Sequence, residues 1–82
     1  MKKNLKIVKA RVVGSSPVHP YNLNDIVDFG ISRLHDQVYD VLINGEHATL
    51  EVKETAFLSA EEYVIRGILH QDGNLGQIAL AI

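Results

Sequence analysis

Histidine is the side chain in this sequence best suited to bind a metal ion, because imidazole is a common ligand for zinc and other transition metals. No two histidines stand two or four residues apart, the spacing at which one strand or helix directs both rings to one ion. The chain also has no cysteine, which excludes thiolate metal sites, disulfides and a cysteine nucleophile. We therefore expect no metal and no cofactor. The four histidines are His19, His35, His47 and His70.

Catalysis by serine or by paired carboxylates finds little support in the sequence. No serine lies in a Gly-x-Ser-x-Gly motif, in which a sharp turn exposes the nucleophile. Asp25 and Asp28, and likewise Asp36 and Asp40, could pair, but such acids on an acidic chain are typical of a solvated face. A chain of 82 residues also leaves little room for a pocket that buries a substrate. We expect that this protein is not an enzyme.

Apolar and aromatic residues occur beside these acids, and an aromatic anchor with a charged rim is typical of binding hot spots. The alternative role for Tyr21 and Phe29 is to close the ends of a barrel. The sequence favours a small accessory protein, without catalysis, that binds another protein through an acidic, loop-rich surface. The predicted protein-binding residues are Tyr21, Leu23, Asp25, Asp28, Phe29, Asp36 and Asp40, with Leu42 in the same apolar set.

Charge is distributed unevenly along the chain. Residues 1–11 carry five cations and no acid, a net charge of +5, whereas residues 12–82 carry three cations and ten acids, a net charge of −7. An acidic body repels phosphate, so binding to nucleic acid would depend on the first strand alone. A nucleic-acid-associated module is therefore the alternative function, ranked below protein binding. Its binding residues would be Lys2, Lys3, Lys6, Lys9 and Arg11.

The length permits one hydrophobic core, so we expect a single small domain over residues 1–82. No apolar run is long enough to span a membrane, and Lys9 and Arg11 interrupt what would be the apolar region of a signal peptide. Without cysteine, a soluble protein of the reducing cytoplasm is expected.

The last eight residues, 75–82, contain no charged side chain. A strand of this composition at a sheet edge invites pairing with another chain. A core of this size cannot enclose every apolar residue of the chain, which predicts a homodimer that covers this strand. The predicted interface residues are Leu75, Ile78, Leu80 and Ile82.

Most of the chain is predicted to form strands. Residues 5–13 combine apolar and basic side chains, but their alternation changes face, which predicts a bulge or burial on both sides. Residues 15–24 contain both prolines and are predicted to form a long loop. Because long loops often carry function, this loop is a candidate binding element.

Two hairpins follow from turn chemistry. Asn44-Gly45 is the favoured pair for a two-residue type I′ turn, and Asp72-Gly73 predicts a second turn, with Gly73-Asn74 as an alternative register. In each hairpin, directly opposed residues share a face. The predicted pairs are Ile43 with Glu46, Val41 with Ala48, Tyr39 with Leu50, Gln37 with Val52, Tyr63 with Ile82, Ile65 with Leu80, and Gly67 with Ile78.

Two segments could instead form helices. Apolar residues recur at helical spacing within 24–42 after the capping pair Asn24-Asp25, and Ser59-Ala60-Glu61-Glu62 resembles a capping box that opens a helix over 59–70. Gly30 and the competing Asn44-Gly45 hairpin oppose the first of these helices. If both formed, the order would be β-α-β-α-β, an α+β domain that is the alternative to a mainly β barrel.

The order of a strand, a long loop, a short strand over 25–29 and the Asn44-Gly45 hairpin resembles a Src-homology-three-like small barrel. The resemblance covers roughly residues 5–58, and it implies a small antiparallel barrel followed by a C-terminal hairpin. The aromatic signature of the proline-binding members is absent, so polyproline binding is not expected. The residues that carry the resemblance are Leu23-Asn24-Asp25-Ile26-Val27, Tyr39-Asp40-Val41 and Ala56-Phe57-Leu58.

Overall fold

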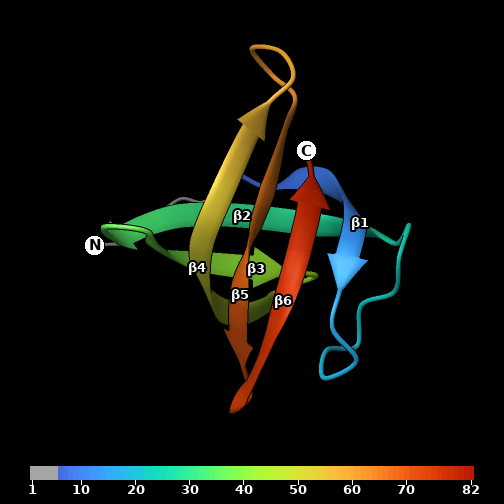
Figure 1. Ribbon diagram of the computed structural model, residues 1–82, viewed down its shortest axis with the longest axis vertical. Helices are drawn as coiled ribbons and strands as arrows, with labels where there is room; N and C mark the ends of the chain where they lie inside the picture. The colour runs from blue at the N-terminus through green and yellow to red at the C-terminus, as the bar shows by residue number, and fades with distance from the viewer. Residues whose placement is uncertain (1–5) are drawn as a thin grey trace.

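The computed structural model, which describes residues 6–82, is a ring of six antiparallel strands in which each strand pairs with its neighbours in the chain and the last pairs with the first (Figure 1). The small antiparallel barrel expected from the sequence is therefore confirmed. The strands are β1 (Val8–Ser15), β2 (Ile26–His35), β3 (Val38–Ile43), β4 (Glu46–Phe57), β5 (Tyr63–Gln71) and β6 (Asn74–Ala81).

No helix occurs in residues 6–82, so the β-α-β-α-β alternative is wrong, and no segment there is a helix that could cross a membrane. The segment 24–42 forms most of the β2–β3 hairpin, in which Ile31 opposes Val41. Its apolar residues also satisfy a period of two, since Val27 and Phe29 alternate with exposed positions and point inward. Pairing with neighbouring strands on both sides favours this period over the helical one.

The second predicted helix is also wrong, although its capping interactions form. The Ser59 hydroxyl accepts hydrogen bonds from the backbone N–H groups of Glu61 (3.3 Å) and Glu62 (3.1 Å). The Leu58 N–H donates to the Glu62 carbonyl at 2.8 Å. These bonds close the loop between β4 and β5 instead of starting a helix, because serine caps turns as well as helices.

Both predicted hairpins are confirmed with their registers. Asn44 and Gly45 have φ of 53° and 83°, and Asp72 and Gly73 have φ of 52° and 78°, the left-handed values that type I′ turns require. The predicted register of β3 with β4 holds from Ile43 outward, and that of β5 with β6 follows the Asp72-Gly73 turn. The paired residues therefore present one apolar face inward.

Closure of the ring corrects the predicted dimer edge. β6 pairs with β5 on one side and with β1 on the other, where Val12 opposes Leu80. Leu80 is fully buried and Ile78 is 3% exposed, so both belong to the core of one chain. Ile82 is half-buried, and only Leu75 of the predicted interface is exposed. The predicted bulge occurs at Val13, where β1 bends between its pairings with Leu80 and Ala79.

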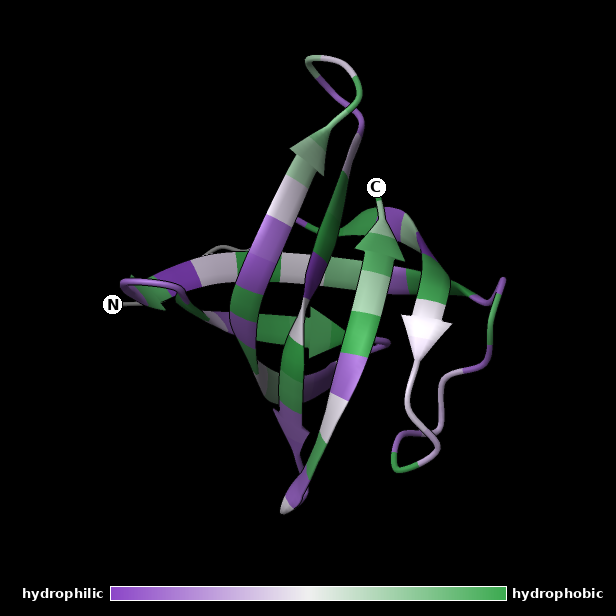
Figure 2. Ribbon diagram, viewed as in Figure 1, coloured by the Kyte–Doolittle hydropathy of each residue, from purple (hydrophilic) through white to green (hydrophobic). Residues whose placement is uncertain are grey.

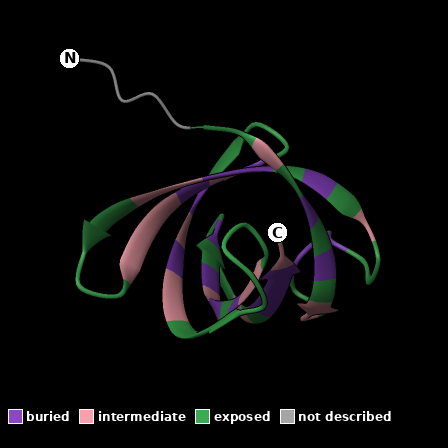
Figure 3. Cartoon of the chain, turned by 90° about the horizontal axis from the view of Figure 1, so that it is seen from above, coloured by how far each residue is buried: buried purple, intermediate pink, exposed green. Residues whose placement is uncertain are grey.

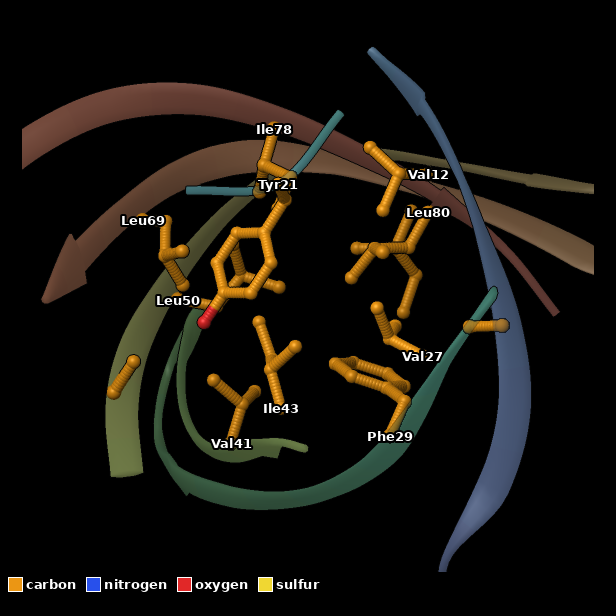
Figure 4. Close-up of a cluster of buried hydrophobic side chains, with 13 residues drawn as sticks. Val12, Tyr21, Val27, Phe29, Val41, Ile43, Leu50, Leu69, Ile78 and Leu80 are labelled. Atoms are coloured by element: carbon orange, nitrogen blue, oxygen red, sulfur yellow. The ribbon is translucent and has the colours of Figure 1, made fainter. Parts of the chain in front are cut away.

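Side chains from all six strands form the core inside the ring. Buried residues alternate with less buried ones along much of the strands (Figure 3), and hydrophobic residues alternate with hydrophilic ones (Figure 2). A barrel of this size has no lumen, because inward side chains occupy it. Figure 4 shows Tyr21 entering this cluster from the loop between β1 and β2. The largest fully buried side chains are Phe29, Ile43, Leu50, Leu69, Leu80, Val12, Val27 and Val41.

Candidate functional site

The structure removes the two aromatic residues from the predicted protein-binding surface. Phe29 is fully buried, because it lies with Val27 on the inward face of β2. Tyr21 is 7% exposed and hydrogen-bonds to the side chain of Gln71 inside the barrel. Both residues have the structural role that the sequence left as their alternative, and neither can anchor a partner at the surface.

The predicted acidic residues do not converge on one site. Asp25 accepts a hydrogen bond from the Asn22 N–H at 2.9 Å, which orders the end of the long loop, and Asp28 forms an ion pair with Lys9. Asp36 lies in the turn between β2 and β3, at the opposite end of β2 from Asp25 and Asp28.

The three remaining predicted residues, Asp40, Leu23 and Leu42, do not gather at one site. Asp40 is half-buried on the outer face of β3, with His47 Nδ1 at 3.9 Å. Leu23 is exposed at the end of the long loop, and Leu42 is half-buried. With its aromatic anchors buried, this set does not form a continuous apolar patch with a charged rim.

The basic residues proposed for nucleic-acid binding are only partly described. Lys2 and Lys3 lie outside the described residues. Lys6 and Arg11 are exposed, and Lys9 is engaged with the Asp28 carboxylate across the β1–β2 pair. An ion pair to an acid reduces the attraction of this lysine for phosphate.

The histidines occupy separate surroundings. His19 is buried, with Nε2 3.1 Å from the Leu69 carbonyl oxygen, which accepts a hydrogen bond from the ring. His35, His47 and His70 lie on the exterior, each near a different carboxylate. Within residues 6–82 no three histidine or acidic side chains are grouped as metal ligands.

The most exposed apolar side chains lie on a hairpin arm that sequence reasoning assigned no role. We define the arm as residues 53–64, the outer parts of β4 and β5 with their loop. Residues 53–62 are all exposed, and the arm projects beyond the ring of strands at the top of Figure 1. Phe57 is 74% exposed and Leu58 is 70% exposed, the highest values among the large apolar side chains described.

The arm projects because β4 separates from β3. The Val52 N–H donates to the Gln37 carbonyl at 2.8 Å, and a bulge at Lys53 follows, beyond which β4 pairs with β5 alone. Gly67 on β5 permits the close approach of β4 at this bend. A Cβ at Gly67 would lie 2.2 Å from the Glu51 carbonyl oxygen, so no other residue fits without moving the strand.

An apolar surface leads from the arm to the barrel core. The rings of Phe57 and Tyr63 contact each other across the arm, with centroids 5.7 Å apart. Tyr63 exchanges backbone hydrogen bonds with Ile82 at the end of the chain. The face of the arm that carries Phe57 and Tyr63 therefore continues into half-buried apolar residues that pack against the core. These residues are Ile31, Tyr39, Val52, Tyr63 and Ile82.

Acidic groups surround the tip of the arm, and the cations lie at its base. Glu61 and Glu62 are exposed in the loop next to Leu58. At the base, Lys53 Nζ is 2.9 Å from Glu51, and its hydrogen bond and charge hold the pKa of Glu51 below its ordinary value. Arg66 lies 3.9 Å from Glu54. The cations at the base are therefore paired, whereas the tip presents carboxylates beside apolar side chains.

A shallow groove of about 430 Å³ crosses the outer face of the barrel below the arm. Gly14, Ala79, Glu54 and Arg66 are among the residues that line it, and a Cβ at Gly14 would lie 3.2 Å from the Ala79 methyl group. Of the charged groups that line it, Glu54 pairs with Arg66, and Lys53 pairs with Glu51 at the base of the arm.

The arm thus combines an exposed aromatic and an exposed aliphatic side chain with nearby carboxylates. Its signal in the sequence was Ala56-Phe57-Leu58 followed by Ser59 and two glutamates, which strand and capping patterns also explain. Compared with known proteins, the chain matches no protein-family model, no curated protein and no solved structure.

Proposed function

We propose that this protein is a small interaction module without catalytic activity, and that it binds a partner protein through the tip of the arm. The observation that carries the proposal is the exposure of the consecutive residues Phe57 (74%) and Leu58 (70%) at the tip of a hairpin that projects from an otherwise well-packed barrel. The acidic, loop-rich surface expected from the sequence is then the β4–β5 loop with Glu61 and Glu62, not the loops around β2.

The energetics support a role in binding. Removing one large apolar side chain from water contributes about 1.5–3 kcal/mol, and aromatic residues such as Phe57 are enriched at the buried centre of protein interfaces. Because Glu61 and Glu62 flank the anchors, the complementary site is an apolar pocket bordered by lysine or arginine. The absence of cysteine supports a reducing, cytoplasmic setting for this partner as well.

The proposal is tested with matched variants of the whole chain. Partners are cross-linked to the wild type in the native host, identified, purified and measured for direct binding by calorimetry. The double variant Phe57→Ser, Leu58→Ser should raise the dissociation constant by about tenfold or more. Leu23→Ser removes a side chain of 61% exposure from the loop before β2, away from the arm, and serves as the control. An equal loss of affinity in the double variant and in Leu23→Ser, or no loss of affinity in either, would overturn the proposal.

A further inference from the structure

The free backbone edge of β4 suggests how the arm holds its partner. We infer that residues 54–57 of β4 accept an extended peptide segment of the partner protein as an added strand, with alternating apolar and basic side chains. The inference rests on the proposed function, since it names the class of partner that the arm binds.

Hydrogen bonding along β4 defines this edge. The bond from the Val52 N–H to the Gln37 carbonyl is the last described one between β4 and the β3 side, and beyond it, among residues 6–82, β4 pairs only with β5. At the tip, the Leu58 N–H is directed to β5, because it donates to Glu62. Alternate residues of a strand direct their backbone groups to opposite edges, so Thr55 and Phe57 direct theirs away from β5.

The edge is open to pairing over these four residues. Natural edge strands are commonly protected by proline, by charges or by a bulge within the strand. Here the bulge lies before the segment, at Lys53, and 54–57 contains no proline and one charged residue, Glu54. A strand this short suits the addition of one peptide, in which main-chain hydrogen bonds supply affinity and alternate side chains supply specificity.

The side chains around the edge indicate the sequence of the peptide. Thr55 opposes Ile65, and Phe57 opposes Tyr63, so one face of an added strand lies against the apolar side of the arm. On the opposite face Glu54 is the charged residue of β4 next to the added strand, and its partner Arg66, 3.9 Å away, lies one strand further on β5. Glu61 and Glu62 lie beyond Glu54 at the tip. Apolar residues fit the first face and lysine or arginine fits the second.

The probe is a blocked peptide of about seven residues that alternates lysine and valine, compared with one that alternates glutamate and valine. Bound to the wild-type protein, the lysine peptide should slow amide hydrogen exchange at Thr55 and Phe57, as measured by NMR, and the glutamate peptide should bind at least tenfold more weakly. Thr55→Pro removes one N–H from the free edge and should reduce binding by about tenfold or more. Thr55→Val retains that N–H and should bind like the wild type.

Each outcome decides the inference. Binding of the lysine peptide without slower exchange at Thr55 and Phe57, or no binding, overturns it, and this readout needs no variant to fold. Slower exchange that depends on protein concentration without peptide means that a second copy occupies the edge, which also overturns it. If the natural partner loses affinity for Phe57→Ser, Leu58→Ser but not for Thr55→Pro, the proposed function stands and the added strand is wrong.

Discussion

The phenol of Tyr21 and the side-chain amide of Gln71, fifty residues apart in the chain, exchange two hydrogen bonds within the barrel. The Tyr21 hydroxyl donates to Gln71 Oε1 at 3.1 Å and accepts from Gln71 Nε2 at 2.9 Å. The Ser15 hydroxyl donates to the Tyr21 carbonyl at 2.7 Å and fixes the loop from which the ring enters the core. This contact closes the end of the barrel opposite the arm.

Tyr21→Phe should destabilise the fold although the ring is retained. The substitution leaves the 5%-exposed amide of Gln71 without its partner, and an unsatisfied buried polar group costs about 1–3 kcal/mol. Urea denaturation measures the change. The double variant Tyr21→Phe, Gln71→Leu should recover part of the loss, because it removes both polar groups; no recovery would contradict the importance of this pair.

Stability should fall at alkaline pH through Tyr21. Burial raises the pKa of Tyr21 above its ordinary value of 10.0, more than the hydrogen bond from Gln71 lowers it. A raised pKa means that the native state holds its proton when the unfolded state has lost it. The stabilisation of the fold by protonated Tyr21 is complete below pH 10 and is lost as the pH rises through the pKa of Tyr21 in the folded state. The ring-carbon NMR signal of Tyr21, assigned by its loss in Tyr21→Phe, should titrate above pH 10.

Gly67→Ala should be strongly destabilising. The new Cβ would meet the Glu51 carbonyl oxygen at 2.2 Å, and overpacking of this kind costs about 1–3 kcal/mol or more. Gly45 has no atom within 4 Å of its Cβ position, so Gly45→Val should cost about 1 kcal/mol or more through its positive φ of 83° alone. Thermal melting compares the two variants. An unchanged melting temperature in Gly67→Ala would contradict the clash with Glu51, and one in Gly45→Val would contradict the strain of the positive φ.

Leu80 and Leu75 should respond in opposite ways to substitution, although the sequence grouped them in one interface. Leu80 is fully buried between β5 and β1, so Leu80→Ala should cost about 2–5 kcal/mol. Leu75 is 60% exposed, and Leu75→Lys should change stability by less than about 0.5 kcal/mol. Equal effects in chemical denaturation would argue against the closed ring.

Acid should weaken the base of the arm through Glu51. The pKa of Glu51 is lowered in the folded state, and Lys53 is the main cause. The stabilisation of the fold by this pair is therefore present above the ordinary pKa of 4.5 and is lost as the pH falls through the pKa of the folded state. Lys53→Met should therefore raise the pKa of Glu51, as followed by its carboxyl-carbon NMR signal. His70→Gln should raise it less, since His70 is a smaller cause. The reverse order would show that Lys53 does not control this carboxylate.

Local chemistry in the sequence determined the two hairpins. Asn44-Gly45 and Asp72-Gly73 adopt positive φ at low cost, and once each turn is fixed, the period of two places every residue of the flanking strands on a known face. The mainly β class and the small barrel follow from these turns and from the β-branched residues between them.

Tertiary structure decided what periodicity left open. The segments 24–42 and 59–70 fit more than one period, and only pairing on both sides selected strands. The closure of β6 onto β1 joins residues far apart in the chain, so an apparent edge strand became part of the core. Long-range contacts also determined which apolar residues are exposed. Tyr21 is buried where it hydrogen-bonds to Gln71. Phe57 is exposed because it lies beyond the bond from Val52 to Gln37, the last described one between β4 and the β3 side. Burial depends on such distant partners, and a local pattern carries no information about them.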